Sequence, residues 1–292
     1  GAARELSGVF YVGAFAHVEE GSIAVEAEAV EFLFVEQFLG GFQVMLAGCP
    51  GTFGRGTDQQ GDVRRGDEVR PALGTQDGAA QHYNAGTPDG SRPGVYYAHL
   101  SDMTAMPKRE LEVIAYHEAI PGHHMQISIA QELEDIPQFR TQQFYNAYVE
   151  GWALYSEWLA KEMPGTYQDP LSEFGRLGSE IWRGIRLVVD TGLHSKGWTK
   201  QQAIDYFLAN SAITEAQAKA EIERYITWPG QATGYKIGMI RIQELRADAE
   251  EELGEDFDIR GFHDAVLGGG GLPLDLLEKR VDQWVESVKA SN

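Results

Sequence analysis

The residues whose types and spacing most clearly suggest metal binding or catalysis lie in the stretch HEAIPGHH, which begins at His117. His117 and Glu118 match the start of the H-E-x-x-H motif, in which two histidines four residues apart bind zinc and the glutamate acts as general base. Here Pro121 occupies the position of the second histidine, and the next histidines are His123 and His124. The stretch therefore predicts a metal site only if its backbone departs from a regular helix.

A proline supplies the physical reason for such a departure. On a straight helix His117 and His123 would lie about 120° apart around the axis and about 9 Å apart along it, too far for one ion. Pro121 cannot donate to the carbonyl of His117, and its ring clashes with that carbonyl. Gly122 permits backbone angles that other residues avoid. We therefore expect a break between Ala119 and His123 that returns His123 to the metal, with the neighbouring His124 as the second choice of ligand.

A third protein ligand is expected on the segment NAYVEGWALYSEWL. On a helix Glu150, Leu154 and Glu157 share one stripe, at positions i, i+4 and i+7. A carboxylate on a stripe that faces other helices is costly to bury unless it meets a cation or a hydrogen-bond donor. Glu150 is therefore the candidate third ligand. Glu157 is the candidate partner that orients a ligand histidine, and Glu118 is left as the general base.

The elements that must position these residues are predicted to be mostly helices. Apolar residues recur at three- and four-residue spacing, with Pro, Ser, Thr or Gly at the segment ends, in seven stretches: 108–119, 137–163, 172–197, 199–210, 214–226, 229–254 and 273–290. No repeat of 20 to 50 residues links them, which argues against a solenoid. The fold class is therefore mainly α.

The region before these helices is expected to differ. Residues 50–107 are rich in Gly, Pro, Asp and Thr and indicate loops, with one short edge strand at GVYYAHL, residues 94–100. The apolar run at residues 30–49 is expected to be a helix. We expect an N-terminal helix and glycine-rich loop segment over residues 1–79, followed by a helical metallohydrolase domain over residues 80–292.

The composition narrows the class of partner. The formal net charge of -20 would repel nucleic-acid phosphates and anionic membrane surfaces. A single cysteine, Cys49, excludes an internal disulfide and leaves a metal site to His, Asp and Glu. Glu31 and Glu36 interrupt the most apolar early run, which excludes a bilayer span. The Leu-Ala-Gly-Cys that ends at Cys49 resembles a lipoprotein cleavage box, but the acidic segment before it is unlike a signal peptide, so we expect no targeting signal.

The motifs resemble those of a bacterial family of uncharacterised proteins, the domain-of-unknown-function family 885, whose members look like gluzincin-type metallopeptidases. The matching pieces include HEAIPGHHMQ, EGWALYSE, DTGLHSKGWT, WPGQATGYKIG and FHDAVLGGGGLPLDLLE. The resemblance implies a multi-helix zincin-like fold similar to enzymes of the angiotensin-converting-enzyme and oligopeptidase type. It also implies zinc on His117, His123 and Glu150, with Glu118 as base, and makes export to the bacterial periplasm an open alternative.

The same resemblance adds two candidates for stabilising an oxyanion. In that wider clan a tyrosine on a late helix and a nearby histidine have this role, and the corresponding residues here are Tyr235 and His263. A helical tyrosine is more often a core residue whose hydroxyl is satisfied. The function that follows is a zinc-dependent hydrolase, most simply a peptidase that cleaves short peptides. The alternatives are a hydrolase of a non-peptide amide or ester, a metal- or peptide-binding protein without turnover, and a purely structural helical protein.

Overall fold

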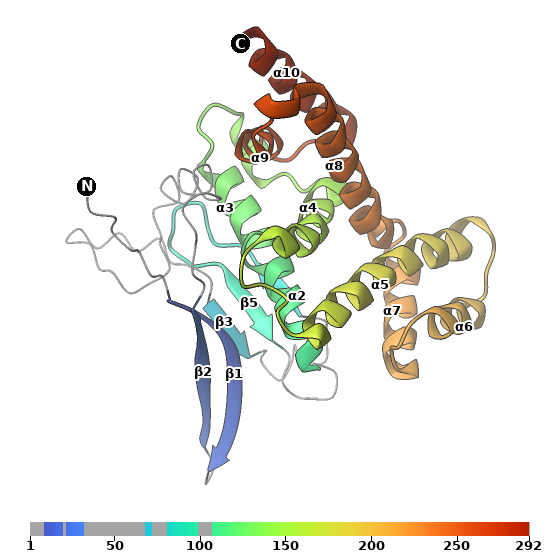
Figure 1. Cartoon of the computed structure of the whole chain (residues 1–292). Coiled ribbons are helices and arrows are strands. Elements are labelled where there is room, and N and C mark those ends of the chain that lie inside the picture. The colour runs from blue at the N-terminus through green and yellow to red at the C-terminus, as the bar shows by residue number, and fades with distance from the viewer. Residues whose placement is uncertain (1–8, 20–21, 32–67, 72–80, 99–106, 292) are drawn as a thin grey trace.

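The computed structural model describes residues 9–19, 22–31, 68–71, 81–98 and 107–291, and this part of the chain is mainly helical, as predicted (Figure 1). The helices follow one another from the middle of the chain to its end. They are α2 (Lys108–Glu118), α3 (His123–Glu132), α4 (Asn146–Leu159), α5 (Pro170–Ser195), α6 (Lys200–Asn210), α7 (Glu215–Thr227), α8 (Gln231–Leu253), α9 (Ile259–Leu267) and α10 (Leu274–Ser291), with short 3-10 turns η2 (Gln138–Gln142), η3 (Ala160–Glu162) and η4 (Gly254–Asp256).

The described strands form two small sheets. β1 (Val9–Glu19) and β2 (Ser22–Glu31) pair as an antiparallel hairpin, whereas β3 (Glu68–Pro71), β4 (His82–Asn84) and β5 (Val95–Ala98) form a sheet in the order β3-β5-β4. The predicted strand exists as β5, but the prediction that it is an edge strand is wrong. β5 pairs in parallel with β3 and antiparallel with β4, so both of its edges are occupied.

The N-terminal prediction is only partly covered by the structure. Residues 32–49 of the expected helix lie outside the described residues, and Val30 and Glu31 belong to strand β2 instead. The hairpin was not anticipated, although β1 contains several aromatic and β-branched residues that favour strands. The expected boundary between residues 79 and 80 also lies outside the described residues and remains a prediction.

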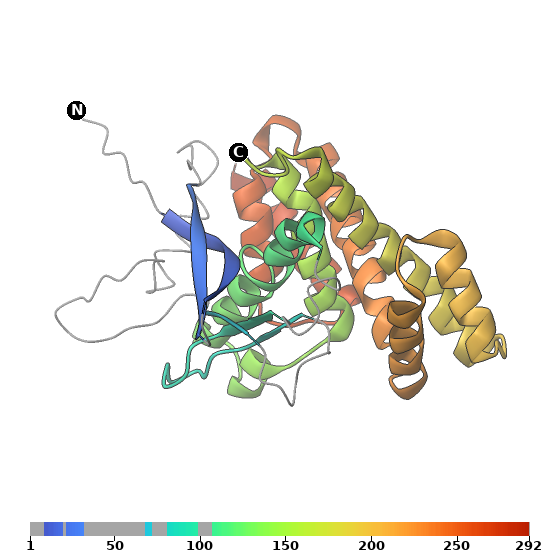
Figure 2. The same cartoon turned by 90° about the horizontal axis from the view of Figure 1, so that it is seen from below.

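The helices bury two apolar clusters. One joins α3, α4, α8, α9 and α10 around Trp152, Met239 and Phe262, all nearly inaccessible to solvent. The other lies among α5, α6 and α7 around Phe207, Ile222 and neighbouring residues. α6 and α7 cover the far end of α5 and lie on the opposite side of the molecule from the β1–β2 hairpin (Figures 1 and 2). α2, α4, α5 and α8 therefore occupy the middle, where the predicted site lies.

Local signals account for the starts of helices α5 and α6. Asp169 caps the start of α5 by accepting from the N–H of Leu171, with Pro170 at the first helical position. Thr199 and Gln202 form a capping box at the start of α6. No helix in the described part of the chain combines the length and apolarity that crossing a bilayer requires.

Candidate metal centre

The predicted break between the two histidines is confirmed. α2 ends at Glu118, and α3 begins at His123. Gly122 packs so tightly against the end of α2 that a Cβ atom on it would lie 1.9 Å from the carbonyl oxygen of His117. The indole of Trp152, on α4, donates a hydrogen bond of 2.7 Å to the carbonyl of Pro121. The break is therefore a fixed part of the fold, held by glycine on one side and by α4 on the other.

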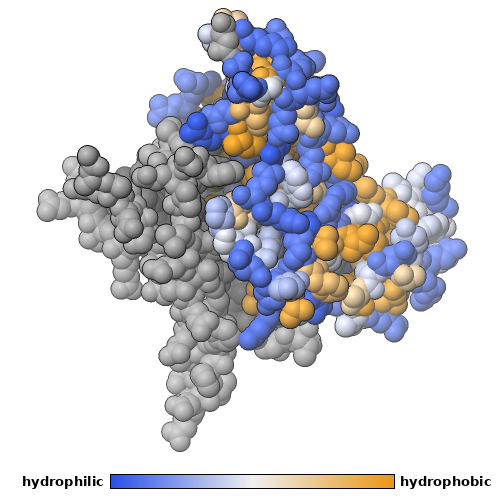
Figure 3. Space-filling view, viewed as in Figure 1, coloured by the Kyte–Doolittle hydropathy of each residue, from blue (hydrophilic) through white to orange (hydrophobic). Residues whose placement is uncertain are grey.

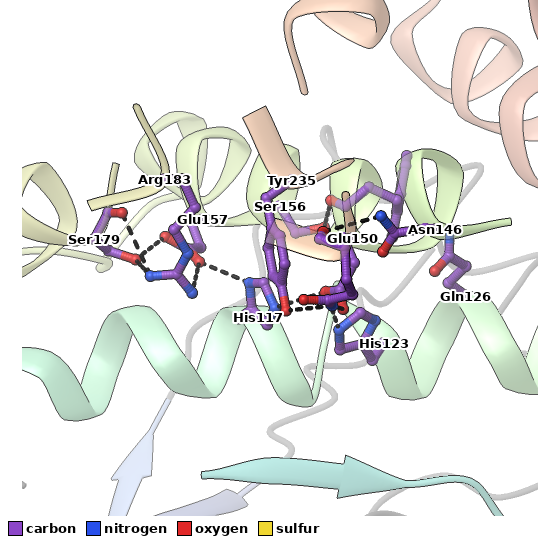
Figure 4. A network of polar contacts seen from close by, with 12 residues as sticks. His117, His123, Gln126, Asn146, Glu150, Ser156, Glu157, Ser179, Arg183 and Tyr235 are labelled. Atoms are coloured by element: carbon purple, nitrogen blue, oxygen red, sulfur yellow. Dashed lines mark hydrogen bonds and ion pairs between the residues drawn. The ribbon is translucent and has the colours of Figure 1, made fainter. Parts of the chain in front are cut away.

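This break brings three buried ligand-type side chains together. His117, His123 and Glu150 are 3%, 9% and 7% exposed, and one potential ligand atom from each lies within 4.8 Å of the other two. Oε2 of Glu150 lies 3.2 Å from Nε2 of His123 and 3.6 Å from Nε2 of His117. The two imidazole rings are nearly perpendicular. The arrangement can hold one metal ion between the three groups (Figure 4).

Glu157 fixes the orientation of His117, as the sequence predicted. Nδ1 of His117 donates to Oε1 of Glu157 over 2.7 Å, which directs Nε2 toward Glu150. The hydroxyl of Ser179 donates to the other oxygen of Glu157 over 2.6 Å, and the guanidinium of Arg183 lies 3.5 Å from Oε1. Figure 4 shows the resulting chain from α5 through Glu157 and His117 to Glu150.

Burial and ion pairing have opposite effects on the pKa values of the residues in this cluster. Burial lowers the pKa of His117, but hydrogen bonding to Glu150 and Glu157 outweighs it and raises this pKa to about 9. Burial raises the pKa of Glu150, yet the two histidines more than reverse that and hold it well below its usual range. Oε1 of Glu150 accepts from Gln231, and Oε2 faces the two imidazoles. A buried, negatively charged oxygen is thus directed at the point where the imidazoles converge.

Glu118 lies beside this cluster and is 7% exposed. Burial raises the pKa of its carboxyl group, and the neighbouring His117 and His123 lower it in part. Because the Glu118 carboxyl group interacts electrostatically with His117, His123 and Glu150, it lies near the ligands, but it does not belong to the three groups whose atoms converge. The structure therefore brings together the predicted ligands and the predicted base.

Tyr235, on α8, also lies beside the three ligand-type side chains. Its ring stacks on that of His117 with 6.0 Å between centroids. Its hydroxyl accepts hydrogen bonds from Gln231 over 3.2 Å and from Arg224 over 3.3 Å. The same Gln231 amide donates to Oε1 of Glu150 over 3.0 Å. Since the hydroxyl oxygen of Tyr235 accepts from two donors, its own proton is available for a third group.

His123 and His124 point toward different neighbours. Nδ1 of His124 shares a hydrogen bond of 2.9 Å with the hydroxyl of Tyr83, on β4, and is not among the converging atoms. Consecutive residues of a helix point about 100° apart, so the two histidines face different neighbours. His123 is the residue that meets Glu150.

His263 was the second candidate for stabilising an oxyanion, and this role stays a prediction. The residue is 2% exposed on α9, where Nε2 shares a hydrogen bond of 3.0 Å with the hydroxyl of Tyr155 and the ring packs against Trp152. His263 does not belong to the three groups whose atoms converge at Glu150. Burial lowers the pKa of His263 to about 3, so it is a neutral core residue.

Comparison with known protein families finds a match over most of the chain. The family described as "Bacterial protein of unknown function (DUF885)" matches residues 43–281. The chain belongs to this family. The resemblance read from the motifs is thereby confirmed at the level of the family.

Two solved structures of related proteins share the fold. A "putative lipoprotein" from Colwellia psychrerythraea is 43% identical with a TM-score of 0.75, and the match covers 86% of this chain and 42% of that chain. A "putative lipoprotein of unknown function" from Shewanella oneidensis is 25% identical with a TM-score of 0.61, covering 72% of this chain and 39% of that chain. The matched region thus spans less than half the length of either relative. No curated protein matches it.

Several residues of the centre were missed by the sequence analysis. Arg186, on α5, lies over the ring of Tyr235 at 4.5 Å and forms an ion pair of 2.9 Å with Glu221. Gln231 and Arg224 hold the hydroxyl of Tyr235. Gln231 lies within the WPGQATGYKIG stretch that supported the family resemblance, four residues before Tyr235, so helical spacing was the signal that could have identified it.

Proposed function

We propose that this DUF885 chain carries the catalytic centre of a zinc-dependent hydrolase that cleaves short peptides. The observation that supports this most is the convergence of Oε2 of buried Glu150 on Nε2 of His123, at 3.2 Å, and on Nε2 of His117, at 3.6 Å. Burying a carboxylate is costly unless it is paired with positive charge, which a cation bound between these three groups would supply. Two histidines and one glutamate are the ligands of several catalytic zinc sites, which keep a fourth position open.

The chemistry would be divided between the ion and the side chains around it. Zinc held by His117, His123 and Glu150 would polarise a substrate carbonyl and lower the pKa of water at the open position. Glu118 would accept the proton of the attacking water and pass it to the leaving amine. The raised pKa of its buried carboxyl group suits a group that must both take and release a proton near neutral pH.

Tyr235 would stabilise the negative charge that develops on the carbonyl oxygen. Its hydroxyl accepts hydrogen bonds from Gln231 and Arg224, which leaves its proton to donate toward the substrate. Donors that are held in place before the reaction are effective because they need no reorganisation during it. Arg186, over the ring of Tyr235, and the stacked His117 ring would keep this hydroxyl in position.

We also propose that the helical architecture is a gluzincin fold of the angiotensin-converting-enzyme and oligopeptidase type. The break in HEAIPGHH, with its second histidine displaced by two residues, supports a modified form of that motif. Export to the periplasm is part of the same proposal, since both solved relatives are described as lipoproteins. Cell fractionation of a bacterium that produces the native protein would test export: recovery in the cytosolic fraction alone would reject it.

Metal analysis and turnover on the same preparations test the function. The purified protein is expected to contain about one zinc per chain and to hydrolyse some members of a panel of short peptides. His123→Ala is expected to lose both properties, whereas His124→Ala, the matched control, should keep the zinc because His124 faces Tyr83. Stoichiometric zinc after joint replacement of His117, His123 and Glu150 would reject the ligand set.

The same experiment separates the rival functions. Full zinc with turnover of esters or non-peptide amides, but not of peptides, would favour the alternative hydrolase. Full zinc with no turnover on any carbonyl substrate would favour a binding protein. A protein without bound zinc that also fails to take up added zinc would be a structural one.

A further inference from the structure

One face of helix α5 is apolar and exposed over most of the length of the helix. Its large side chains recur every three to seven residues on the same side. They are Leu171, Phe174, Leu177, Ile181 and Val188, which are 62%, 52%, 50%, 52% and 36% exposed. We call these five residues the α5 stripe. It runs for about 25 Å, and an apolar stripe of this kind normally faces a protein interior.

The stripe is part of a wider apolar surface. Ile237 and Ile240, on the neighbouring helix α8, are 46% and 40% exposed. Lys236 and Glu180 join the two helices through an ion pair of 2.7 Å. Figure 3 shows hydrophobic residues gathered over α5 and α8 on one face of the molecule. Contiguous apolar patches of several hundred square ångströms are uncommon on proteins that work alone and commonly mark interaction surfaces.

The charged residues beside the stripe have their partners within this chain. Glu173 forms ion pairs with Lys161 at 2.7 Å and with Arg176 at 3.0 Å. Glu180 is paired with Arg176 at 2.9 Å as well as with Lys236. A partner that binds this face therefore has to cover its apolar side chains, and it does not have to supply countercharges.

Two glycines on the same face have space for a larger side chain, so no contact in the described part of the chain requires glycine there. A Cβ atom on Gly178 or Gly184 would meet nothing within 4 Å, whereas one on Gly175, on the buried side of α5, would lie 1.7 Å from the carbonyl oxygen of Arg109. Glycine inside a helix costs roughly 0.5–1 kcal/mol relative to alanine. Two open glycines that flank an apolar stripe are expected where another backbone approaches closely.

The solved relatives indicate what that other backbone is. This chain covers 42% of the Colwellia protein and 39% of the Shewanella protein, so more than half of each relative lies outside the shared region. We call that portion the additional half. It must pack against the shared region or remain a separate unit. The α5 stripe is a long, uncharged, helix-sized surface that could receive it.

We propose that the α5 stripe is the docking surface for a polypeptide segment equivalent to the additional half of the longer DUF885 proteins. The proposal rests on the fold, the exposed side chains and the coverage of the relatives, and it is independent of the proposed catalytic activity. It carries a consequence for the centre. The opposite face of α5 holds Ser179 and Arg183 against Glu157, so a segment docked on the stripe would steady the helix that orients His117.

The coordinates of the Colwellia relative provide the first test. The residues that superpose on the α5 stripe are expected to be apolar and to lose at least half of their exposed area to the additional half of the same chain. Burial of those positions by a second copy of the protein, or their exposure to solvent, would overturn the proposal.

A chimera provides the second test. In the chimera, this chain replaces the matching region of the Colwellia protein, and the additional half of that protein is kept. Phe174→Glu with Ile181→Glu is expected to lower the melting temperature of the chimera by about 5 °C or more, because charges would be buried at the interface. The same pair should change the chain alone far less. The control is Phe139→Glu, an exposed aromatic residue on η2 that should affect neither protein.

Three results would contradict the proposal. The first is an equal shift of the melting temperature in the chimera and in the chain alone. The second is a dimer of the chain alone, seen by sedimentation, that the double variant converts to monomer, because the stripe would then serve a second copy. The third is flotation of the wild-type chain with lipid vesicles that the double variant abolishes, because the stripe would then face a membrane.

Discussion

Replacing Glu118 with glutamine separates catalysis from metal binding. The substitution keeps the shape of the side chain and removes its ability to accept a proton from water. Glu118 is not among the three converging ligand atoms, so the zinc content should be unchanged. Burial already raises the pKa of this carboxyl group, so a neutral amide is no more costly to bury and the fold should be retained.

The size of the effect follows from the lack of a substitute base among the described residues. Glu150 would be occupied as a ligand, and both oxygens of Glu157 are engaged, one by His117 and one by Ser179. General base catalysis typically contributes about 10²–10⁴-fold, or about 2.7–5.4 kcal/mol of transition-state stabilisation. We therefore expect kcat to fall by a factor within this range, with little change in KM.

The assay is hydrolysis of a short peptide by wild-type and Glu118→Gln protein, with metal analysis of both samples and a melting curve to verify folding. Zinc retained and kcat reduced by at least about 100-fold would support the assignment. Loss of zinc would instead make Glu118 a ligand or a structural residue. Activity within about tenfold of the wild type would refute the reasoning, because another group would then accept the proton.

The other predictions concern the groups around the ligands. Glu157→Gln removes the charge that orients His117 and should weaken zinc binding by about 10- to 100-fold in a competition titration with a chelator; unchanged affinity would show that the ring is held by packing. Tyr235→Phe should lower kcat by about 10²–10³-fold at unchanged zinc content, and an effect on KM alone would make the residue a binding group. Gly122→Ala places a methyl group against the carbonyl of His117, so it should lose zinc and melt at a lower temperature, whereas Gly178→Ala, with open space around it, should do neither.

The sequence was most informative where one physical constraint had few solutions. Pro121 cannot continue a helix that carries His117, so the break was predictable, and the structure has it between Glu118 and His123. The spacing of Glu150 and Glu157 on one helical stripe likewise predicted that both would meet histidines. Local periodicity also identified the helices that carry these residues.

The sequence was least informative where contacts between distant segments decide the outcome. Nothing local to FHDAV predicts that its histidine is buried beside Tyr155 and Trp152, because contacts between α9 and α4 place it there. The strand β5 has the same composition at an edge as in the middle of a sheet, so its pairing with β3 and β4 was not readable from its residues. Arg186 meets Tyr235 only because α5 and α8 pack side by side.

The centre depends on how closely α4 approaches α8. A Cβ atom on Gly151 would lie 2.5 Å from the Cα of Gly238, and one on Gly238 would lie 1.8 Å from the carbonyl oxygen of Ala147. Each glycine adjoins a functional residue in sequence or in space: Gly151 follows Glu150, and Gly238 lies one helical turn after Tyr235. The backbone contact therefore sets how deeply Tyr235 reaches toward His117 before any substrate or metal is bound. A hydroxyl held in this way needs no rearrangement when charge develops beside it, which is the property that an oxyanion donor requires.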